Sequence, residues 1–205
     1  MNLKFRFLII FLGAFALIFT VLNSRFVEAN VKFWLLTGTD QYSLNRFITT
    51  EVKSEKKDLP DDAVIVIESL GVRAPIVFNV GDDTKAIYDN LENGAVHYSN
   101  TSKPGEGGVS VVLGHSSAYP WYKGAYGSVF ALLGKLQPGD IFYVEYADGS
   151  RFVYSMKQAI VFSPFANDER LQEIEKSDKD TVVLLSCWPV GTNYKRIAVQ
   201  AELVE

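Results

Sequence analysis

Residues 181–200 read TVVLLSCWPVGTNYKRIAVQ. Two short apolar runs rich in β-branched residues, 181–185 and 197–199, flank a segment that holds a proline, a glycine and an asparagine. This pattern predicts two strands joined by a loop. The only cysteine of the chain, Cys187, is placed where the first strand should end, and Arg196 where the second should begin. If the two strands are neighbours, a thiol and a guanidinium meet at one end of a sheet, and a lone cysteine there is a candidate nucleophile.

A cysteine nucleophile needs a histidine, and the chain has only His97 and His115. His115 follows a predicted strand, residues 109–113, and precedes two serines of a loop, so it is the candidate general base and acid; the alternative is a strand-end histidine bonded to nearby backbone. His97 lies near a predicted helix end and is expected to be structural. Taken alone, a cysteine such as Cys187 is more often a small buried apolar residue than a nucleophile. Arg196 is either a solvated strand residue or a donor that stabilises an oxyanion.

Composition excludes several classes of protein. The chain of 205 residues carries a net charge of -4, which argues against a nucleic-acid partner because phosphate binding needs clustered Lys and Arg. One cysteine excludes an intramolecular disulfide, and one cysteine with two histidines makes a closed zinc site of Cys and His ligands unexpected. Acidic residues including Asp82, Asp83 and Glu106 could bind calcium, but solvated surface is the expected role, so no cofactor is predicted.

The N-terminus carries an uncharged apolar run at residues 7–22, preceded by Lys4 and Arg6. The run is slightly shorter than a typical membrane span, but flanking basic residues can extend it by snorkelling, so a signal-anchor helix is predicted. A cleaved signal peptide is the main alternative, although its best small-residue cleavage site, residues 27–29, lies well past the apolar run. A buried helix is the third. The basic residues before the run predict a cytoplasmic N-terminus and an extracellular catalytic domain.

The remaining chain is expected to form one domain behind a tether. The predicted division is residues 1–25 for the cytoplasmic end and anchor, 26–60 for a juxtamembrane tether, and 61–205 for the domain. Strands are predicted at 63–68, 72–78, 109–113, 141–146, 151–161, 181–185 and 197–199. Short helices are predicted around 82–91 and 167–174, with a helical turn at 130–136. The fold class is therefore mainly β, a closed or nearly closed, mostly antiparallel barrel of about eight strands with two or three short helices.

Several separated blocks together resemble the sortase family of cysteine transpeptidases. The blocks are Leu184-Leu185-Ser186-Cys187 with Pro189, Gly191, Asn193 and Arg196; Gly94 to His97; Pro104-Gly105; Leu113-Gly114-His115; Phe130, Leu133, Leu136, Gly139 and Asp140; and Val72 to Val77. The order His, Cys, Arg agrees with the family, and the likeness spans residues 63–199. The chain departs from the family pattern at Val183 and Ser186, where threonines are usual, and at Val109, where asparagine is common. Residues 38–60 lack the Asp-Pro-aromatic motif of lidded pilin-type sortases.

The resemblance implies a role for each site residue. Cys187 would attack the Thr carbonyl of a Leu-Pro-x-Thr-Gly-like sorting signal, Arg196 would stabilise the oxyanion, and His115 would protonate the departing amine. Substrate contacts are expected from Ser186, Trp188 and Asn193. The implied partners are a surface protein with a C-terminal sorting signal and an amine acceptor such as a cell-wall precursor or a pilin. Two alternatives stay open: a thiol hydrolase that uses the same dyad with water, and a sortase-fold binding or assembly module without turnover. An L,D-transpeptidase is disfavoured because no His-Gly-Cys spacing surrounds Cys187.

Overall fold

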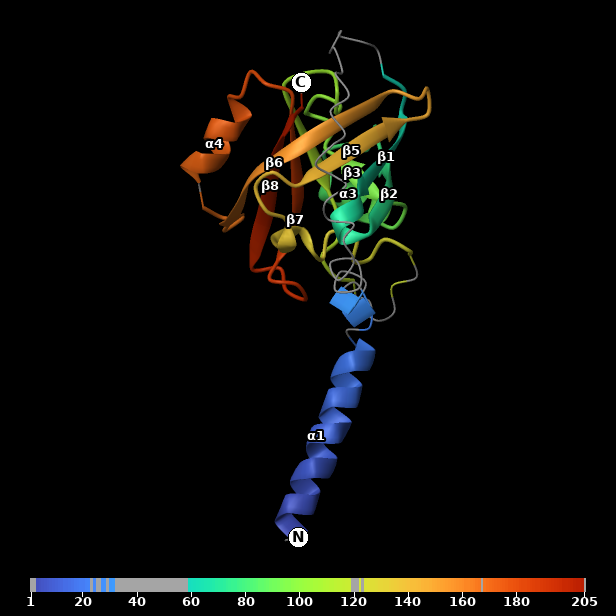
Figure 1. The fold of residues 1–205 in the computed structure, drawn as a ribbon, viewed down its shortest axis with the longest axis vertical. Helices are drawn as coiled ribbons and strands as arrows, with labels where there is room; N and C mark the ends of the chain where they lie inside the picture. The colour runs from blue at the N-terminus through green and yellow to red at the C-terminus, as the bar shows by residue number, and fades with distance from the viewer. Residues whose placement is uncertain are drawn as a thin grey trace.

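The computed structural model describes residues 3–22, 24, 27, 28, 30, 31, 59–118, 122, 124–166 and 168–204. The first element, α1 (Leu3–Leu22), stands apart from the rest of the protein (Figure 1). Its apolar window, Lys4–Val21, has a mean hydropathy of 2.1, and none of it is buried against other residues. A helix of this length and composition is suited to a membrane anchor or to a signal sequence. The predicted tether lies mostly outside the described residues.

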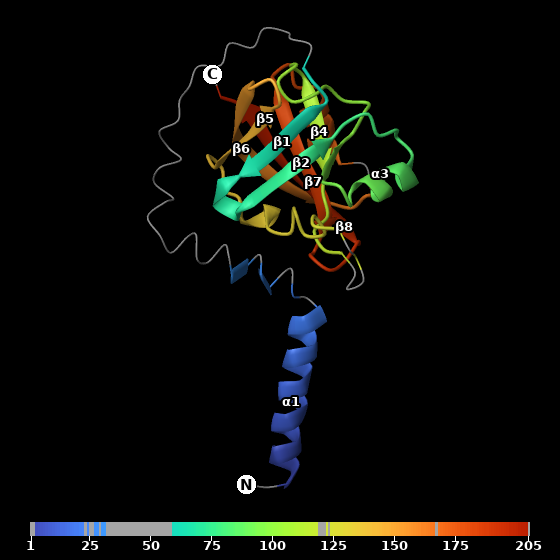
Figure 2. The ribbon, with the colours of Figure 1, turned by 90° about the vertical axis from the view of Figure 1, so that its right-hand side faces the viewer.

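Eight strands form a closed barrel in the order β1-β2-β3-β4-β7-β8-β6-β5 (Figure 2). Neighbouring strands are antiparallel except for the pairs β2–β3 and β4–β7, which are parallel. The predicted fold class is therefore confirmed. The strands are β1 (Asp62–Ile67), β2 (Val72–Val77), β3 (Ala95–His97), β4 (Val109–Leu113), β5 (Ile141–Tyr146), β6 (Arg151–Phe162), β7 (Thr181–Trp188) and β8 (Lys195–Leu203).

Side chains alternate between the barrel interior and its outer face, as the strand period requires. The interior is a single apolar core. Every strand except β3 contributes large side chains to it, among them Ile65, Val112, Phe142, Tyr154, Leu184 and Val199, whereas β3 contributes the small Ala95. Two smaller apolar clusters cover parts of the outer face. One lies between β3, β4 and α3 (Thr84–Asn90), and the other between β6, β7, β8 and α4 (Glu169–Glu175).

Both short helices begin at the acidic caps that the sequence suggests. The Asp83 side chain accepts hydrogen bonds from the backbone N–H groups of residues 85 and 86 at the start of α3. Asp168 accepts one from the N–H of Arg170 at the start of α4. The predicted helical turn at 130–136 consists of turns followed by the 3₁₀ helix η3 (Leu133–Lys135), and a second 3₁₀ helix, η2 (Glu68–Leu70), joins β1 to β2.

Three strand assignments differ clearly from the prediction, and one of them is β8, which extends over Lys195–Leu203 where only 197–199 was predicted. The strand β7 does not end before Cys187 but continues to Trp188, because its last residues pair with the start of β8, Cys187 with Arg196 and Trp188 with Lys195. The three-residue strand β3 was not predicted, because its short sequence has no alternation to reveal it and its pairing with β2 and β4 is non-local.

Candidate active site

The register of three adjacent strands brings His115, Cys187 and Arg196 together. Leu113, the last residue of β4, is paired with Leu185 of the parallel strand β7. His115 lies two residues beyond Leu113, after the end of β4, and Cys187 lies two residues beyond Leu185 within β7. On the other side of β7, the antiparallel register pairs Cys187 directly with Arg196 of β8. Neighbouring strands lie about 4.8 Å apart, so Cys187 and Arg196 are adjacent, and His115 follows the end of the strand on the other side of β7.

Cys187 and Arg196 both point to the outer face of the barrel. Val183 and Leu185 belong to the outer apolar cluster under α4, and Cys187 follows them with the same parity. Ala198 of the same cluster fixes the parity of β8, which places Arg196 outward as well. Cys187 is a free, half-buried thiol at the edge of this cluster. The nucleophile is therefore open to a ligand that approaches from outside the barrel.

His115 also lies on the outer face, between two aromatic rings. Leu113, two residues earlier, packs outward against the cluster under α3. The imidazole centroid lies 6.3 Å from the ring of Tyr88 on α3 and 5.6 Å from the ring of Tyr122, which meets it edge-on. Burial lowers the pKa of His115 below its ordinary value, and the negative charge of Glu92 opposes this shift. The neutral imidazole that results near pH 7 is the form that can accept a proton from a thiol.

The guanidinium of Arg196 is held by its own loop. Its Nη1 donates to the carbonyl oxygens of Asn193, at 3.1 Å, and of Lys195, at 3.0 Å. Among the residues that the structure describes, no other donor of this guanidinium has a protein acceptor, so Nε and Nη2 remain available for an anionic ligand. Asn193 therefore contributes to the site through its carbonyl group, while the residue itself lies exposed in the loop between β7 and β8.

Ser186 and Trp188 have the opposite parity and point into the barrel. Ser186 is 3% exposed, and its Oγ donates to the carbonyl of Gly114 at 2.7 Å. Trp188 packs against the interior core, so closely that a Cβ added to Gly134 would lie 2.8 Å from its ring. The structure does not bring these two side chains to the face that carries Cys187.

His97 lies in the barrel wall away from the outer-face site. It is 4% exposed and its Nε2 bonds to the carbonyl of Ser102 at 2.8 Å, which agrees with the structural role expected for it. The residues that sequence reasoning missed are Tyr88 and Tyr122, because neither is close to His115 in the chain. Among the described residues there is no group of three or more His, Cys, Asp or Glu that could hold a metal ion.

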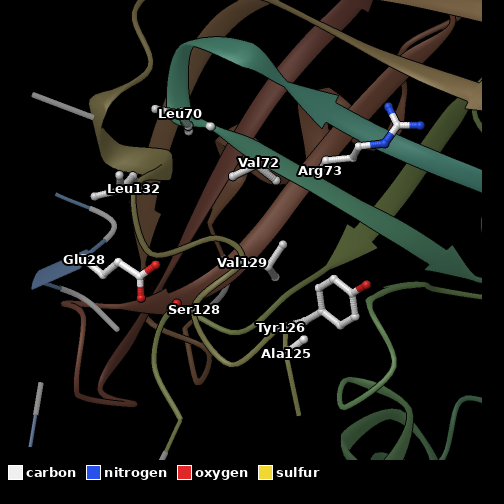
Figure 3. Close-up of a pocket in the computed structure, with 10 residues that line it drawn as sticks. Glu28, Leu70, Val72, Arg73, Ala125, Tyr126, Ser128, Val129 and Leu132 are labelled. Carbon is white, nitrogen blue, oxygen red and sulfur yellow. The ribbon is translucent and has the colours of Figure 1, made fainter. Parts of the chain in front are cut away.

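A pocket of about 440 Å³ lies elsewhere on the barrel (Figure 3). Glu28 of the N-terminal segment reaches it from one side, and the start of β2 and the segment before η3 form its walls. Its lining contains none of the three outer-face residues, so the pocket is not the site of the Cys–His–Arg arrangement. The lining residues are Glu28, Leu70, Gly71, Val72, Arg73, Ala125, Tyr126, Ser128, Val129 and Leu132.

A cysteine, a histidine and an arginine on the outer face of a closed β-barrel are the kinds of group that acyl transfer through a thiol requires. The sortase-domain family model matches residues 65–204, and the chain therefore belongs to the sortase family, a family of cysteine transpeptidases. A search of curated protein sequences gives no match.

Solved sortase structures resemble the chain over most of its length. Sortase C-1 from Actinomyces oris is 27% identical, with a TM-score of 0.57, over 78% of this chain and 87% of that one. A lid mutant of sortase A from Corynebacterium diphtheriae is 26% identical, with a TM-score of 0.57, over 73% of each chain. Sortase C from Clostridium perfringens is 26% identical, with a TM-score of 0.53, over 87% of this chain and 90% of that one.

Proposed function

We propose that this chain is a membrane-anchored transpeptidase that cleaves a Leu-Pro-x-Thr-Gly-like sorting signal through a thioester on Cys187. The observation that carries the proposal is that Cys187 of β7 pairs with Arg196 of β8, while His115 follows the end of β4, the strand that pairs with β7 on its other side. Membership of the sortase family supports the reaction class.

Each of the three residues has a defined step in this reaction. The Cys187 thiol passes its proton to His115 as its sulfur bonds to the scissile carbonyl carbon, and the carbonyl oxygen becomes an oxyanion. The free donors of Arg196 stabilise that oxyanion, because a guanidinium stays charged at any working pH. The oxyanion then collapses, the C–N bond breaks, and His115 returns its proton to the departing amine. An acceptor amine next attacks the thioester carbonyl, forms a new amide bond and releases the thiol.

The cellular setting follows from α1. We place its N-terminal end in the cytoplasm and the barrel outside the cell, because Lys4 and Arg6 precede the apolar run. The substrate is then a surface protein with a C-terminal sorting signal, and the acceptor is an amine of a cell-wall precursor or a pilin. An anchored enzyme meets both at the outer membrane surface.

Intact-mass spectrometry of the full-length protein in detergent tests the chemistry. Incubation with a Leu-Pro-x-Thr-Gly peptide should add the acyl fragment to the wild-type protein but not to Cys187→Ala. His115→Gln should lose the adduct, whereas His97→Gln, which changes the other histidine, should keep it. Cleavage of the peptide by Cys187→Ala would refute the assignment of the nucleophile.

The acceptor is tested separately by adding a primary amine such as triglycine. Amide product in proportion to the amine supports transpeptidation, and release of free acid alone at every amine concentration supports a thiol hydrolase instead. Binding of the peptide with neither product would identify a module without turnover. The topology has its own test, because Cys187 is the only thiol of the chain: a membrane-impermeant maleimide should label it on intact cells.

A further inference from the structure

The parallel ladder between β4 and β7 stops one bond short of the nucleophile. At its beginning the N–H of Thr181 donates to the carbonyl of Gly108 at 2.8 Å, and near its end the N–H of Gly114 donates to the carbonyl of Leu185 at 3.0 Å. Bonds of a parallel ladder alternate evenly between the two strands. The next bond of an uninterrupted ladder would therefore run from the N–H of Cys187 to the carbonyl of Gly114.

A side chain takes that acceptor instead. The Gly114 carbonyl accepts the buried Ser186 hydroxyl at 2.7 Å, and among the described residues no backbone bond joins Cys187 N to Gly114 O. The antiparallel ladder on the other side does not use this N–H either. The bond from Leu203 N to Asp180 O shows which backbone groups point toward β8. They are the N–H and C=O groups of every second residue along β7, counted from Asp180, which directly precedes the strand. Cys187 has the other parity, so its N–H points toward the His115 side of the site.

We propose that Ser186 is a positioning residue that keeps the backbone N–H of Cys187 available as a second oxyanion donor beside Arg196. This inference rests on the proposed acyl transfer. When Sγ of Cys187 bonds to the carbonyl carbon, the oxygen takes up the electron pair of the broken π bond, and the N–H of the same residue lies close to it. A preorganised donor of this kind stabilises charge that develops only in the transition state. The hydroxyl contributes by occupying the one backbone acceptor that would otherwise bind this N–H.

Removal of the Ser186 hydroxyl should extend the ladder between β4 and β7 by one backbone hydrogen bond. Gly114 is buried, and a buried carbonyl without a donor is unfavourable, so in Ser186→Ala or Ser186→Val the nearest N–H, that of Cys187, should bond to it. The oxyanion then keeps only the guanidinium. Loss of one oxyanion donor lowers turnover about 100-fold or more in well-studied acyl-transfer enzymes, and a fall of about this size is expected for the rate of thioester formation. Ser186→Thr keeps a hydroxyl and should keep the wild-type rate.

Alkylation of Cys187 by iodoacetamide separates this role from a structural one. The displacement of iodide forms no oxyanion, so its rate and its pH profile should be the same in the wild type, Ser186→Ala, Ser186→Val and Ser186→Thr. Thioester formation should fall in the alanine and valine variants only. The proposal is overturned if Ser186→Val forms the thioester at the wild-type rate, or if thioester formation and alkylation fall together.

The single cysteine also allows a direct view of the N–H. Full-length protein labelled with ¹⁵N-cysteine gives one amide signal, whose hydrogen exchange can be followed in detergent. The wild-type amide should exchange rapidly, and that of Ser186→Ala slowly, because it has gained the Gly114 carbonyl. A wild-type amide that is already protected would overturn the proposal. A wild-type protein that forms no thioester although its amide exchanges rapidly would refute the proposed function, and with it the oxyanion role. It would not refute the claim that the Ser186 hydroxyl replaces the Cys187 N–H as the donor to the Gly114 carbonyl.

Discussion

Replacement of Gly114 by alanine tests whether close packing holds the backbone that carries His115. A Cβ built on Gly114 would lie 2.3 Å from Cδ2 and 2.8 Å from Cε2 of the Phe130 ring. Phe130 is 1% exposed, and its N–H donates to the carbonyl of His115 at 2.9 Å. The Phe130 ring therefore has little space into which it could move. Any shift of Phe130 also displaces the backbone of His115, because the two residues are hydrogen-bonded.

The magnitude follows from the size of the overlap. The closest approach is about 1 Å inside ordinary van der Waals contact, and inserting a group into a packed core costs typically about 1–3 kcal/mol. For a domain of this size that corresponds to a fall of roughly 3–10 °C in the melting temperature. Thermal unfolding of the full-length protein in detergent, followed by tryptophan fluorescence, measures it, because Trp188 packs against the barrel core.

The matched control is Gly81→Ala, since a Cβ at Gly81 would meet no atom within 4 Å and its backbone φ is not positive. Its melting temperature should be unchanged or slightly higher, because alanine restricts the unfolded chain. Thioester formation should fall in Gly114→Ala at temperatures where the protein is still folded, and should be normal in the control. Equal melting temperatures for the two variants would refute the argument from packing.

Three further predictions concern charge and hydrogen bonds. Because Glu92 raises the pKa of His115 against the effect of burial, Glu92→Gln should lower that pKa further and move the acid limb of the kcat/KM profile to lower pH; an unchanged or higher limb would contradict this assignment. Burial lowers the pKa of His97, so its contribution to stability is present above the ordinary histidine value of about 6.5 and is lost as the pH falls through the folded-state value. His97→Gln keeps a donor for the loop carbonyl, and its melting temperature should fall less than that of the wild type between pH 7.5 and pH 5. The Tyr154 hydroxyl donates to Asp180 at 2.9 Å, so Tyr154→Phe should cost roughly 1.5–3 kcal/mol in urea unfolding at pH 7, and less at low pH, where the carboxyl is protonated. An equal cost at both pH values would show that the bond to the charged carboxylate is not the cause.

Local patterns predicted the elements whose partners are close in sequence. The two strands of the β5–β6 hairpin were predicted at 141–146 and 151–161, and the strand at 109–113 was located to the residue. The adjacency of β4 and β7 had no such signal, because parallel partners are joined by a long connection whose length does not specify them. Cys187 and Arg196 could be paired from a local loop, whereas His115 was proposed as their partner from its residue type and its position after a strand, with no local signal that the two strands are adjacent.

The direction of the side chains next to Cys187 was the second feature that could not be predicted from the sequence. Substrate contacts from Ser186 and Trp188 were expected from the resemblance to sortases, without knowledge of where these side chains point. In a strand, however, the residues on either side of an outward side chain point inward, and the strand was predicted to end too early for this alternation to be applied. Once β7 is known to extend through Cys187, its two neighbours must face the core, where Trp188 fills space and Ser186 donates to the carbonyl of Gly114, just after the adjacent strand β4.

The catalytic geometry is therefore a matter of strand register. The ladder from Val109–Thr181 to Leu113–Leu185 keeps β4 and β7 in step, so outward residues of one strand lie beside outward residues of the other. A slip of one residue in this ladder would turn His115 into the barrel and leave Cys187 beside an inward-facing neighbour. Loop insertions between β4 and β7 leave the register intact, whereas changes that weaken the ladder itself do not. It follows that the pairing of the buried strand ends, more than the length or sequence of the connecting loops, determines whether the thiol and the imidazole meet.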